Sequence, residues 1–226
     1  MAKTISIAID GPAGAGKSTI ARRLAKELGY YYVDTGAIYR TVAYFFDLWG
    51  ISPKDLDGIT RYIDELTIGI EYDEEGVQHM IMNGMDVTAD IRTQDISQKA
   101  SLVSAHAIVR DLLLDMQRDM AAKHNVIMDG RDIGTVVLPK ATVKIFLTAS
   151  PEVRARRRTR ELLDKGQKAD YQRILKEIQQ RDYQDTHRQV APLKAARDAV
   201  TLDTSEMDLD SVIAAIKEIV SRKVAL

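Results

Sequence analysis

The sequence predicts an α/β fold in which helices flank a parallel sheet and a small antiparallel insertion interrupts the pattern. Three observations predict this fold. Short apolar segments alternate along the chain with segments of helical spacing, which is typical of parallel sheets. A glycine-rich turn joins the first strand-like segment to the first helix-like segment. Between about residues 60 and 100 the alternation stops, and two strand-like segments are separated only by a turn.

The first two strand–helix units lie near the N-terminus. Residues 5–9 alternate in the manner of a β-strand, and apolar residues at a spacing of four, up to Leu28, predict a helix that ends at Gly29. Residues 30–33 then predict a second strand, and residues 38–49 predict a second helix. This order of elements is the one expected of a parallel sheet with helical crossovers.

The insertion is predicted from the middle of the chain. Residues 67–72 and 77–82 predict two strands, which the polar turn at residues 73–76 joins as a hairpin. Asn83 and Gly84 predict a further turn directly after it. A hairpin within an alternating fold predicts an added subdomain.

The alternating pattern returns in the second half. Helical spacing covers residues 97–123, and residues 126–128 and 143–147 predict buried strands. Pro151 suits the first turn of a further helix. The last helix presents one apolar face, formed by Val212, Ile213, Ile216, Ile219 and Val220. We expect this face to serve packing alone.

Composition excludes several classes of protein. The 226 residues are 45% hydrophobic and 29% charged with a formal net charge of −1, so no overall field attracts the chain to DNA or acidic membranes. The chain has no cysteine, which excludes disulfides and thiolate metal sites. No apolar segment approaches the ~18 residues needed to span a bilayer, and the N-terminal one is too short for a signal peptide. We therefore expect a cytoplasmic monomer that binds no nucleic acid polymer and no membrane.

A phosphate-binding loop follows the first strand. Residues 11–18 match G-x-x-x-x-G-K-[ST] at every fixed position, between a strand and a helix as the pattern requires. The glycines let backbone N–H groups converge on phosphate oxygens, and the helix N-terminus adds about half a positive charge. We expect Lys17 to neutralise the β- and γ-phosphates and the Ser18 hydroxyl to bind Mg²⁺. The predicted ATP-binding residues of this loop are Gly11, Pro12, Ala13, Gly14, Ala15, Gly16, Lys17, Ser18 and Thr19.

The loop indicates a nucleoside triphosphate without saying what happens to its γ-phosphate. The Asn-Lys-x-Asp pattern of GTPases is missing from the sequence. Motor and transporter ATPases are larger and do not concentrate arginine in so short a chain. The remaining features favour phosphoryl transfer to a second anion.

Two strand ends carry candidates for binding that anion, because ligands of parallel sheets lie beyond the carboxyl ends of the strands. Thr35 follows the second strand, and Arg40 lies in the first turns of the next helix, where it suits a phosphate. Asp129 ends another strand, where we expect its carboxylate to hold Mg²⁺ through water, and Arg131 beside it suits a phosphate. Taken alone, Thr35 and Arg40 also fit a helix N-cap and a surface arginine, and residues 129–132 also fit a polar turn.

A basic segment lies between residues 151 and 168. It holds Arg154, Arg156, Arg157, Arg158, Arg160, Lys165 and Lys168. Spacing predicts the ion pairs Arg157–Glu161 and Arg160–Asp164, which leaves three arginines without a partner within the helix. The segment fits a solvated helix face, but we favour a mobile lid that closes over the transferring phosphates and excludes water.

The helix that begins near residue 171 changes character along one face. Ile174 and Ile178 define an apolar stripe that continues as Arg181, Asp185 and Arg188. A stripe that becomes charged either enters solvent or enters a polar cleft. In a cleft, Asp185 can accept a hydrogen bond from a ribose hydroxyl and the arginines can hold phosphate.

With these features assembled, the chain closely resembles the bacterial cytidylate kinases over almost its whole length. The resemblance is carried by residues 9–17 (IDGPAGAGK), 34–40 (DTGAIYR), 90–94 (DIRTQ), 129–135 (DGRDIGT), 144–147 (KIFL) and 190–193 (VAPL). That family is similar in fold to adenylate kinase. The resemblance therefore implies an α/β, parallel-sheet P-loop kinase core with a lid and a nucleoside-monophosphate subdomain, whose long form carries a small antiparallel β insertion. It implies one domain, 1–226, with core 1–38, 103–150 and 171–226, subdomain 39–102 and lid 151–170.

The resemblance also implies an activity and a set of roles. The implied activity is transfer of the ATP γ-phosphoryl group to CMP or dCMP with Mg²⁺, giving CDP or dCDP and ADP. Arg40, Arg131 and Arg188 are implied to bind the acceptor phosphate, Ser101, Arg110 and Asp132 to read cytosine, and Arg181 and Asp185 to contact the sugar. Thr35 stands where the family often has serine. The implied lid arginines are Arg154, Arg157 and Arg158, and two of them, Arg154 and Arg157, are also implied to contact ATP. The implied catalytic set is Lys17, Arg131, Arg157 and Arg158. Ser18 is glycine in some members, so a magnesium role of its hydroxyl is not essential to the family.

Other functions remain open from the residues alone. Another kinase of the phosphate-loop group could act on a different nucleotide or metabolite. A regulatory module would bind ATP without transferring phosphate, although it would not need a second anion site. ADP production without any acceptor would instead indicate a simple ATPase.

Overall fold

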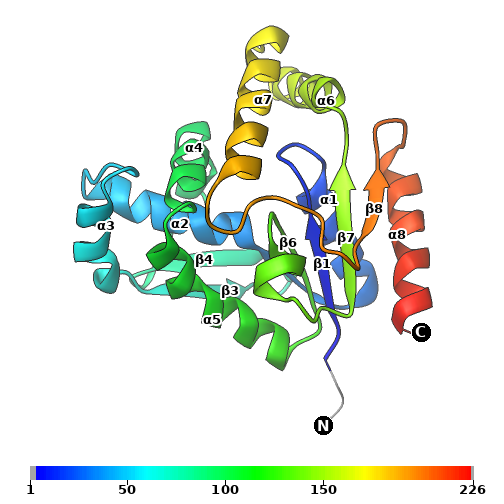
Figure 1. Cartoon of the computed structure of the whole chain (residues 1–226), viewed down its shortest axis with the longest axis horizontal. Helices are drawn as coiled ribbons and strands as arrows, with labels where there is room; N and C mark the ends of the chain where they lie inside the picture. The colour runs from blue at the N-terminus through cyan, green and yellow to red at the C-terminus, as the bar shows by residue number, and fades with distance from the viewer. Residues whose placement is uncertain (1–3, 225–226) are drawn as a thin grey trace.

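The core of the fold is a five-stranded sheet in which every pairing is parallel, in the order β2-β6-β1-β7-β8 (Figure 1). Its strands are β1 (Ser6–Asp10), β2 (Tyr31–Asp34), β6 (Val126–Gly130), β7 (Val143–Thr148) and β8 (Val200–Asp203). This computed structural model describes residues 4–224. The register pairs Asp34 with Asp129 and Asp10 with Gly130, so the carboxyl ends of three strands coincide. The predicted fold class is confirmed.

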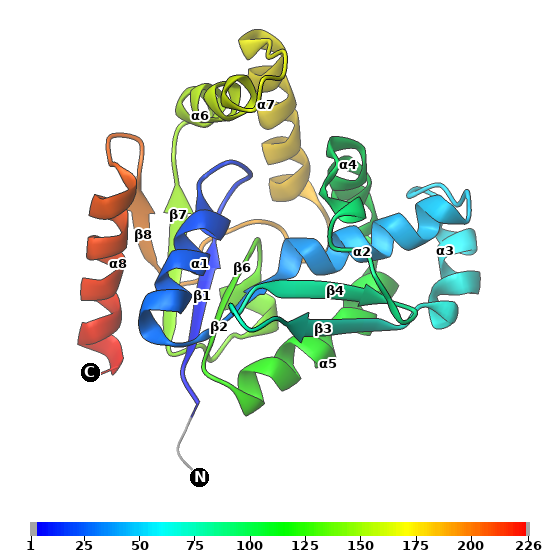
Figure 2. The same ribbon diagram turned by 180° about the vertical axis from the view of Figure 1, so that it is seen from behind.

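Helices cover both faces of this sheet (Figures 1 and 2). Helices α1 (Lys17–Leu28) and α8 (Leu209–Val224) pack on one face, against Ile7 and Ile9. Helices α2 (Thr35–Leu48) and α5 (Ala107–Lys123) pack on the other, against Ala8. Successive residues of a strand point to opposite faces, so a strand covered on both sides is apolar throughout.

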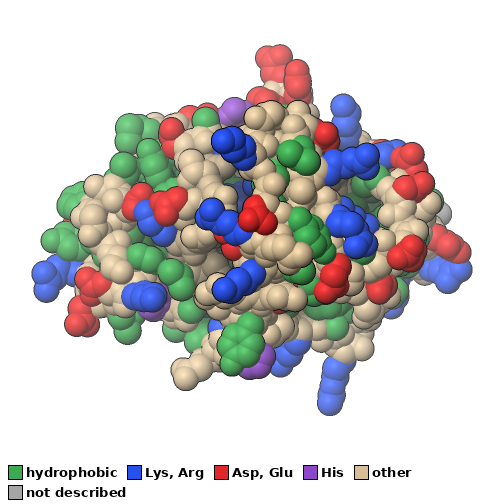
Figure 3. Space-filling model, turned by 90° about the horizontal axis from the view of Figure 1, so that it is seen from above, with side chains coloured by type: hydrophobic (Ala, Val, Ile, Leu, Met, Phe, Trp, Pro, Cys, Tyr) green, Lys and Arg blue, Asp and Glu red, His purple; other side chains and the backbone are tan. Residues whose placement is uncertain are grey.

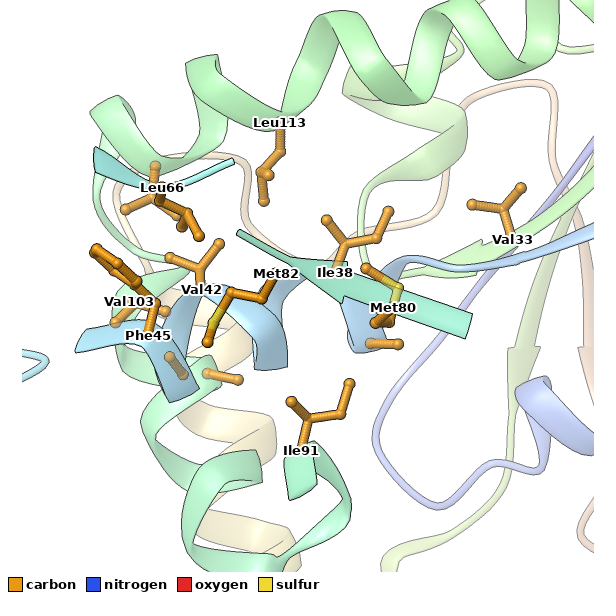
Figure 4. Packing of buried hydrophobic residues seen from close by; sticks show 14 of the residues in the cluster. Val33, Ile38, Val42, Phe45, Leu66, Met80, Met82, Ile91, Val103 and Leu113 are labelled. Carbon is orange, nitrogen blue, oxygen red and sulfur yellow. The ribbon is translucent and has the colours of Figure 1, made fainter. Parts of the chain in front are cut away.

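The insertion is a separate three-stranded antiparallel sheet, as predicted. Its strands are β3 (Ile68–Tyr72), β4 (Gln78–Met82) and β5 (Met85–Asp86), in that order. The turn between β4 and β5 contains Asn83 in the left-handed region, with φ 49°, which asparagine tolerates well. Met80 and Met82 extend from β4 toward Ile38 and Val42 of α2 (Figure 4). The insertion therefore packs on the helix that follows β2.

Two helices stand above the carboxyl ends of the strands, α6 (Pro151–Asp164) and α7 (Tyr171–His187) (Figure 1). The Ser150 hydroxyl accepts a hydrogen bond from Val153 N and caps α6, with Pro151 in the first turn as predicted. The two helices share a small cluster of buried residues, Ala155, Ile174 and Ile178, separate from the two clusters that flank the sheet.

Some elements differ from the prediction. Helix α3 (Leu56–Tyr62) and the edge strand β8 were not predicted, because α3 is short and all but one residue of β8 are exposed, leaving little periodicity. The predicted helix at 97–123 is two helices, α4 (Gln94–Val103) and α5, broken where the Ser104 hydroxyl donates to Ser101 O. The short helices are the 3₁₀ helices η1 (Ile63–Glu65) and η2 (Asp90–Arg92) and the π-helix η3 (Ile133–Val137). Within residues 4–224, no helix is both long and apolar enough to cross a membrane.

Candidate active site

The phosphate loop, residues 11–16, connects β1 to α1 as predicted. A Cβ atom at Gly11 would lie 1.9 Å from the backbone oxygen of Leu147 in the neighbouring strand β7, so only glycine fits there. Gly14 and Gly16 have φ of 75° and 86°. These left-handed conformations turn the backbone around the site that phosphate groups would occupy.

Lys17 is buried at the base of this loop, where its Nζ donates to Pro12 O at 2.8 Å. Burial lowers the pKa of Lys17 to about 7, and the nearby Arg131 guanidinium lowers it further, while Asp129 opposes the shift. An anion bound next to Lys17 would favour the charged form and raise this pKa. The side chain is therefore placed to meet a phosphate.

Ser18 and Asp129 lie together beside the loop. The Ser18 hydroxyl donates to Asp129 Oδ2 at 2.9 Å and the Tyr32 hydroxyl to Asp129 Oδ1 at 2.8 Å. Burial raises the pKa of the Asp129 carboxyl, with a contribution from the negative charge of Asp34. A hydroxyl and a buried carboxylate fit Mg²⁺, which prefers oxygen ligands. No cluster of three or more His, Cys, Asp or Glu side chains suited to a metal occurs within residues 4–224.

A cavity of about 220 Å³ opens next to Lys17 and Ser18. All nine predicted substrate-binding residues line it, namely Thr35, Arg40, Ser101, Arg110, Arg131, Asp132, Arg181, Asp185 and Arg188. They come from α2, α4, α5, α7 with its C-terminal end, and the segment after β6. The face at the carboxyl ends of the strands carries Lys and Arg side chains interspersed with Asp and Glu (Figure 3). Thus the fold brings together residues that are up to 153 positions apart in the sequence, from Thr35 to Arg188.

Two of the arginines that line the cavity keep unused donors. Arg40 Nη2 pairs with Asp34 Oδ2 at 3.0 Å, and Arg131 Nε pairs with Asp185 Oδ2 at 2.7 Å. Within residues 4–224, the Nε atoms of Arg40 and Arg181 are buried and meet no acceptor. Burial lowers the pKa of Arg181 to about 10, and Arg131 adds to the shift. Buried donors without an acceptor are costly, so this part of the cavity suits an anion.

A second group of side chains centres on Asp132. Its carboxylate accepts hydrogen bonds from Arg110 and, at 3.1 Å, from Arg188 Nη2. The Arg110 guanidinium lies 5.6 Å from the centre of the Tyr39 ring, and Ser101 lines the same cavity. Carboxylate, guanidinium and hydroxyl groups together offer both donors and acceptors to a planar base.

The segment that carries Asp132 is held by the end of β1. The Asp10 carboxylate accepts hydrogen bonds from Ile133 N and Gly134 N, each at 2.7 Å. Burial raises the pKa of Asp10 to about 6, against the lowering effect of these two bonds. Asp10 therefore fixes the turn after β6 on which Arg131 and Asp132 lie.

The three predicted lid arginines lie outside this cavity. Arg154 is buried, donates to Ala13 O at 3.0 Å and pairs with Asp182 of α7 at 2.5 Å. Arg157 donates to Thr204 O at 2.5 Å, and Arg158 pairs with Glu161 at 2.8 Å. The predicted pair Arg157–Glu161 is wrong, because the Arg157 guanidinium turns toward the segment after β8 and Arg158 takes its place. Thr19 of the predicted loop is exposed and does not line the cavity.

Some residues of the site were not predicted to have a role. Asp34, Tyr39 and Ser104 line the cavity, and Asp182 holds Arg154. Asp34 had a signal in the sequence, because it ends β2 just as Asp129 stands near the end of β6, where the register pairs the two residues. The others depend on packing between helices that are distant in sequence.

Comparison with known proteins identifies the family. A family model described as cytidylate kinase matches residues 7–222. The cytidylate kinase of Carboxydothermus hydrogenoformans is 50% identical over 217 residues, which cover 96% of this chain and 97% of that protein. The cytidylate kinase of an Exiguobacterium species is 48% identical over 220 residues, 97% of this chain and 98% of that protein. A solved structure of an uncharacterized protein from Eubacterium ventriosum, 14% identical, matches in fold with a TM-score of 0.51 and covers 97% of this chain and 99% of that one. The chain belongs to the cytidylate kinase family.

Proposed function

We propose that this protein transfers the γ-phosphoryl group of ATP to CMP or dCMP, giving ADP and CDP or dCDP. One observation carries the proposal: the phosphate loop opens into the same cavity as Arg40, Arg131 and Arg181, two of which have a buried Nε without an acceptor within residues 4–224. A site for one triphosphate thus adjoins a site for a second anion. The phosphotransferase class follows from the family to which the chain belongs.

The proposed chemistry needs positioning and charge neutralisation rather than a strong base. A phosphate oxygen of CMP attacks the γ-phosphorus in line, the bond to the β-phosphate oxygen breaks, and ADP leaves. A phosphate monoester is largely ionised near neutral pH, so it needs little deprotonation. Lys17, Arg131 and the lid arginines Arg157 and Arg158 would neutralise the transferring group.

Mg²⁺ would bind with ATP beside Ser18 and Asp129. When bound, the ion neutralises phosphate charge. Asp129 would act mainly through water, and the Ser18 hydroxyl, which donates to Asp129 at 2.9 Å, would face the same ion. The positive charge would favour the ionised form of Asp129, whose pKa is raised by burial in the free protein.

Base selection would come from the group around Asp132. Cytosine presents an amine donor beside a ring nitrogen and a carbonyl that accept, so Asp132 or Ser101 can accept from the amine and Arg110 can donate. Uracil reverses two of these groups, and two mismatched buried hydrogen bonds cost roughly 2–6 kcal/mol. The resemblance implies a phosphate role for Arg188, but this arginine contacts Asp132 and Ser104. We therefore propose that Arg188 contributes to the base pocket.

The proposal includes the division of the chain and its state. Residues 39–102 would form the nucleoside-monophosphate subdomain, residues 151–170 the lid, and the rest the core. The buried cluster between α6 and α7 is separate from those that flank the sheet, and it joins the proposed lid to the first half of α7. We also propose that the protein acts as a monomer in the cytoplasm.

The test is ADP release with ATP–Mg²⁺ and one acceptor at a time: CMP, dCMP, UMP, AMP, GMP or none. We expect strong turnover with CMP and dCMP and little with the others. Turnover with another acceptor would keep the kinase and overturn the roles of Ser101, Arg110 and Asp132. ATP binding without turnover on any acceptor would instead favour a regulatory module.

A further inference from the structure

One polar side chain interrupts the buried face of β4. Gln78, Met80 and Met82 alternate along this strand and are 6%, 1% and 2% exposed. The two methionines pack toward Ile38 and Val42 of α2 (Figure 4). Packing accounts for the methionines but not for a buried amide, which needs hydrogen-bond partners.

The Gln78 amide meets the backbone of Asp34. Gln78 Oε1 accepts a hydrogen bond from Asp34 N at 2.7 Å, and Gln78 Nε2 lies 3.5 Å from Asp34 O and donates to Met80 Sδ at 3.0 Å. β2 is the edge strand of the parallel sheet, so these groups face away from β6. The Tyr72 hydroxyl, also from the insertion, donates to Tyr32 O on the same edge at 2.8 Å. Side chains of the insertion thus make hydrogen bonds to the backbone groups of β2 that a further strand would otherwise pair with.

Asp34 connects this edge to the cavity. Its carboxylate caps α2 by accepting from Ala37 N at 2.8 Å, and it pairs with Arg40 at 3.0 Å. Thr35, the next residue, donates its hydroxyl to Asp129 O at 2.7 Å. The backbone of Asp34 therefore sets the direction of Arg40, which lines the cavity with its Nε buried.

We propose that Gln78 is a positioning residue for the acceptor nucleotide. It holds the Asp34 backbone, Asp34 orients Arg40, and Arg40 meets the acceptor phosphate. The antiparallel insertion is by this route part of the acceptor site, although among residues lining the cavity none comes from its strands. The inference rests on the proposed function, because it assigns Arg40 to the acceptor.

The test compares Gln78→Met with Tyr72→Phe. Methionine keeps the length and packing volume of glutamine but not the amide, and Tyr72→Phe removes a hydrogen bond to the same strand edge that does not involve Asp34. We expect Gln78→Met to raise KM for CMP roughly 2- to 10-fold with KM for ATP unchanged. Tyr72→Phe should leave both KM values unchanged, even if it lowers the melting temperature. The Asp34 amide should also exchange with solvent faster in Gln78→Met.

An unchanged KM for CMP in folded Gln78→Met, or equal changes in both KM values, would overturn the inference. If Gln78→Met does not fold, Gln78→Asn keeps a polar amide but is one methylene too short for the 2.7 Å contact with Asp34 N, and an unchanged KM for CMP there would overturn the inference too. The proposed function fails differently, because the wild-type protein would then release no ADP in response to CMP.

Discussion

Lys17 lies in a position that disfavours its charge until an anion binds. Burial and Arg131 lower its pKa to about 7. Removing the Lys17 side chain therefore removes an unfavourable buried charge from the nucleotide-free protein. We predict that Lys17→Ala lowers kcat roughly 10²–10³-fold while the melting temperature does not fall. Lys26→Ala, an exposed lysine on the same helix, should change neither value. A folded Lys17→Ala protein with near-full turnover would contradict the assignment.

Arg110 should govern the choice of base. It is buried, donates to Asp132 and lies over Tyr39. We predict that Arg110→Met lowers kcat/KM for CMP roughly 5- to 150-fold, the range of one buried hydrogen bond, and narrows the ratio of CMP to UMP turnover. Arg118→Met is the matched control, because Arg118 lies on the same helix and donates to Val136 O and Val137 O outside the cavity. A preserved CMP to UMP ratio in Arg110→Met would exclude Arg110 from base reading.

At the residue scale, the sequence located the cavity residues better than their pairings. Arg40 and Arg131 follow strands, and parallel strands end at one edge, so their convergence was predictable. Ion pairs between helices were not, because they depend on packing. Arg154 meets Asp182 of α7, and Arg157 reaches Thr204 beyond β8, contacts that no spacing within α6 encodes.

At the scale of elements, α6 and the segment that follows it should respond to both nucleotides. Arg157 and Arg158 lie outside the cavity in this structure, so a lid role requires residues 151–170 to move toward the phosphates. We predict slower amide hydrogen exchange in residues 151–170 when ATP–Mg²⁺ is bound together with the product CDP, compared with the free protein. Residues 209–224 of α8, which cover the far side of the sheet, serve as the internal control. Unchanged exchange in residues 151–170 would contradict the lid.

The insertion carries a pH-dependent contact of its own. His79 Nδ1 lies 2.7 Å from Asp86 and Nε2 lies 3.4 Å from Asp73. Hydrogen bonds that the His79 ring donates to Asp86 and then to Asp73 raise the pKa of His79, while hydrogen bonds from Thr88 and then from His79 lower the pKa of Asp86 to about 2. The raised pKa of His79 stabilises the folded protein below about pH 6.5, and this stabilisation is lost as the pH rises through the raised pKa. The lowered pKa of Asp86 stabilises the folded protein above about pH 4, and this stabilisation is lost as the pH falls through the lowered pKa. The contact is therefore strongest between these limits.

The corresponding prediction concerns His79→Gln. The melting temperature of His79→Gln should fall below that of the wild type at about pH 5.5. The difference should shrink as the pH rises toward about 8.5, because His79 loses its charge as the pH passes its raised pKa. His187→Gln, which alters a ring packed on Tyr183 of α7, should not reproduce this pattern. A difference that is the same at both pH values would mean that the charge of His79 does not stabilise the insertion.

Elements with strong periodicity were predictable and weakly patterned ones were not. The hairpin of β3 and β4 follows from alternation and a polar turn. β8 has one half-buried residue, Leu202, between exposed neighbours, so its sequence resembles a loop. The break between α4 and α5 arises from local competition by Ser104 and from a contact of His106 with Pro53 O at 2.8 Å, which no periodicity reveals.

At the scale of the whole molecule, the buried residues within 4–224 form three hydrophobic clusters. One joins α1 and α8 to the sheet, one joins α2, α4 and α5 to its other face and to the insertion, and one joins α6 to α7. The cavity is lined from all three, by Lys17, Arg110 and Asp185 among others. The sequence predicted that the helix of Asp185 enters a cleft, but not that this helix, α7, packs in one cluster with α6.

We propose that two nucleotides bind in this cavity with their phosphates facing each other. The most direct test is a single compound in which cytidine and adenosine are joined through five phosphates. We predict that one molecule binds per chain, competes with both ATP and CMP, and stabilises the folded protein by about 2.7 kcal/mol at 100 times its Kd. Competition with only one of the two nucleotides, or binding of two molecules per chain, would contradict the account.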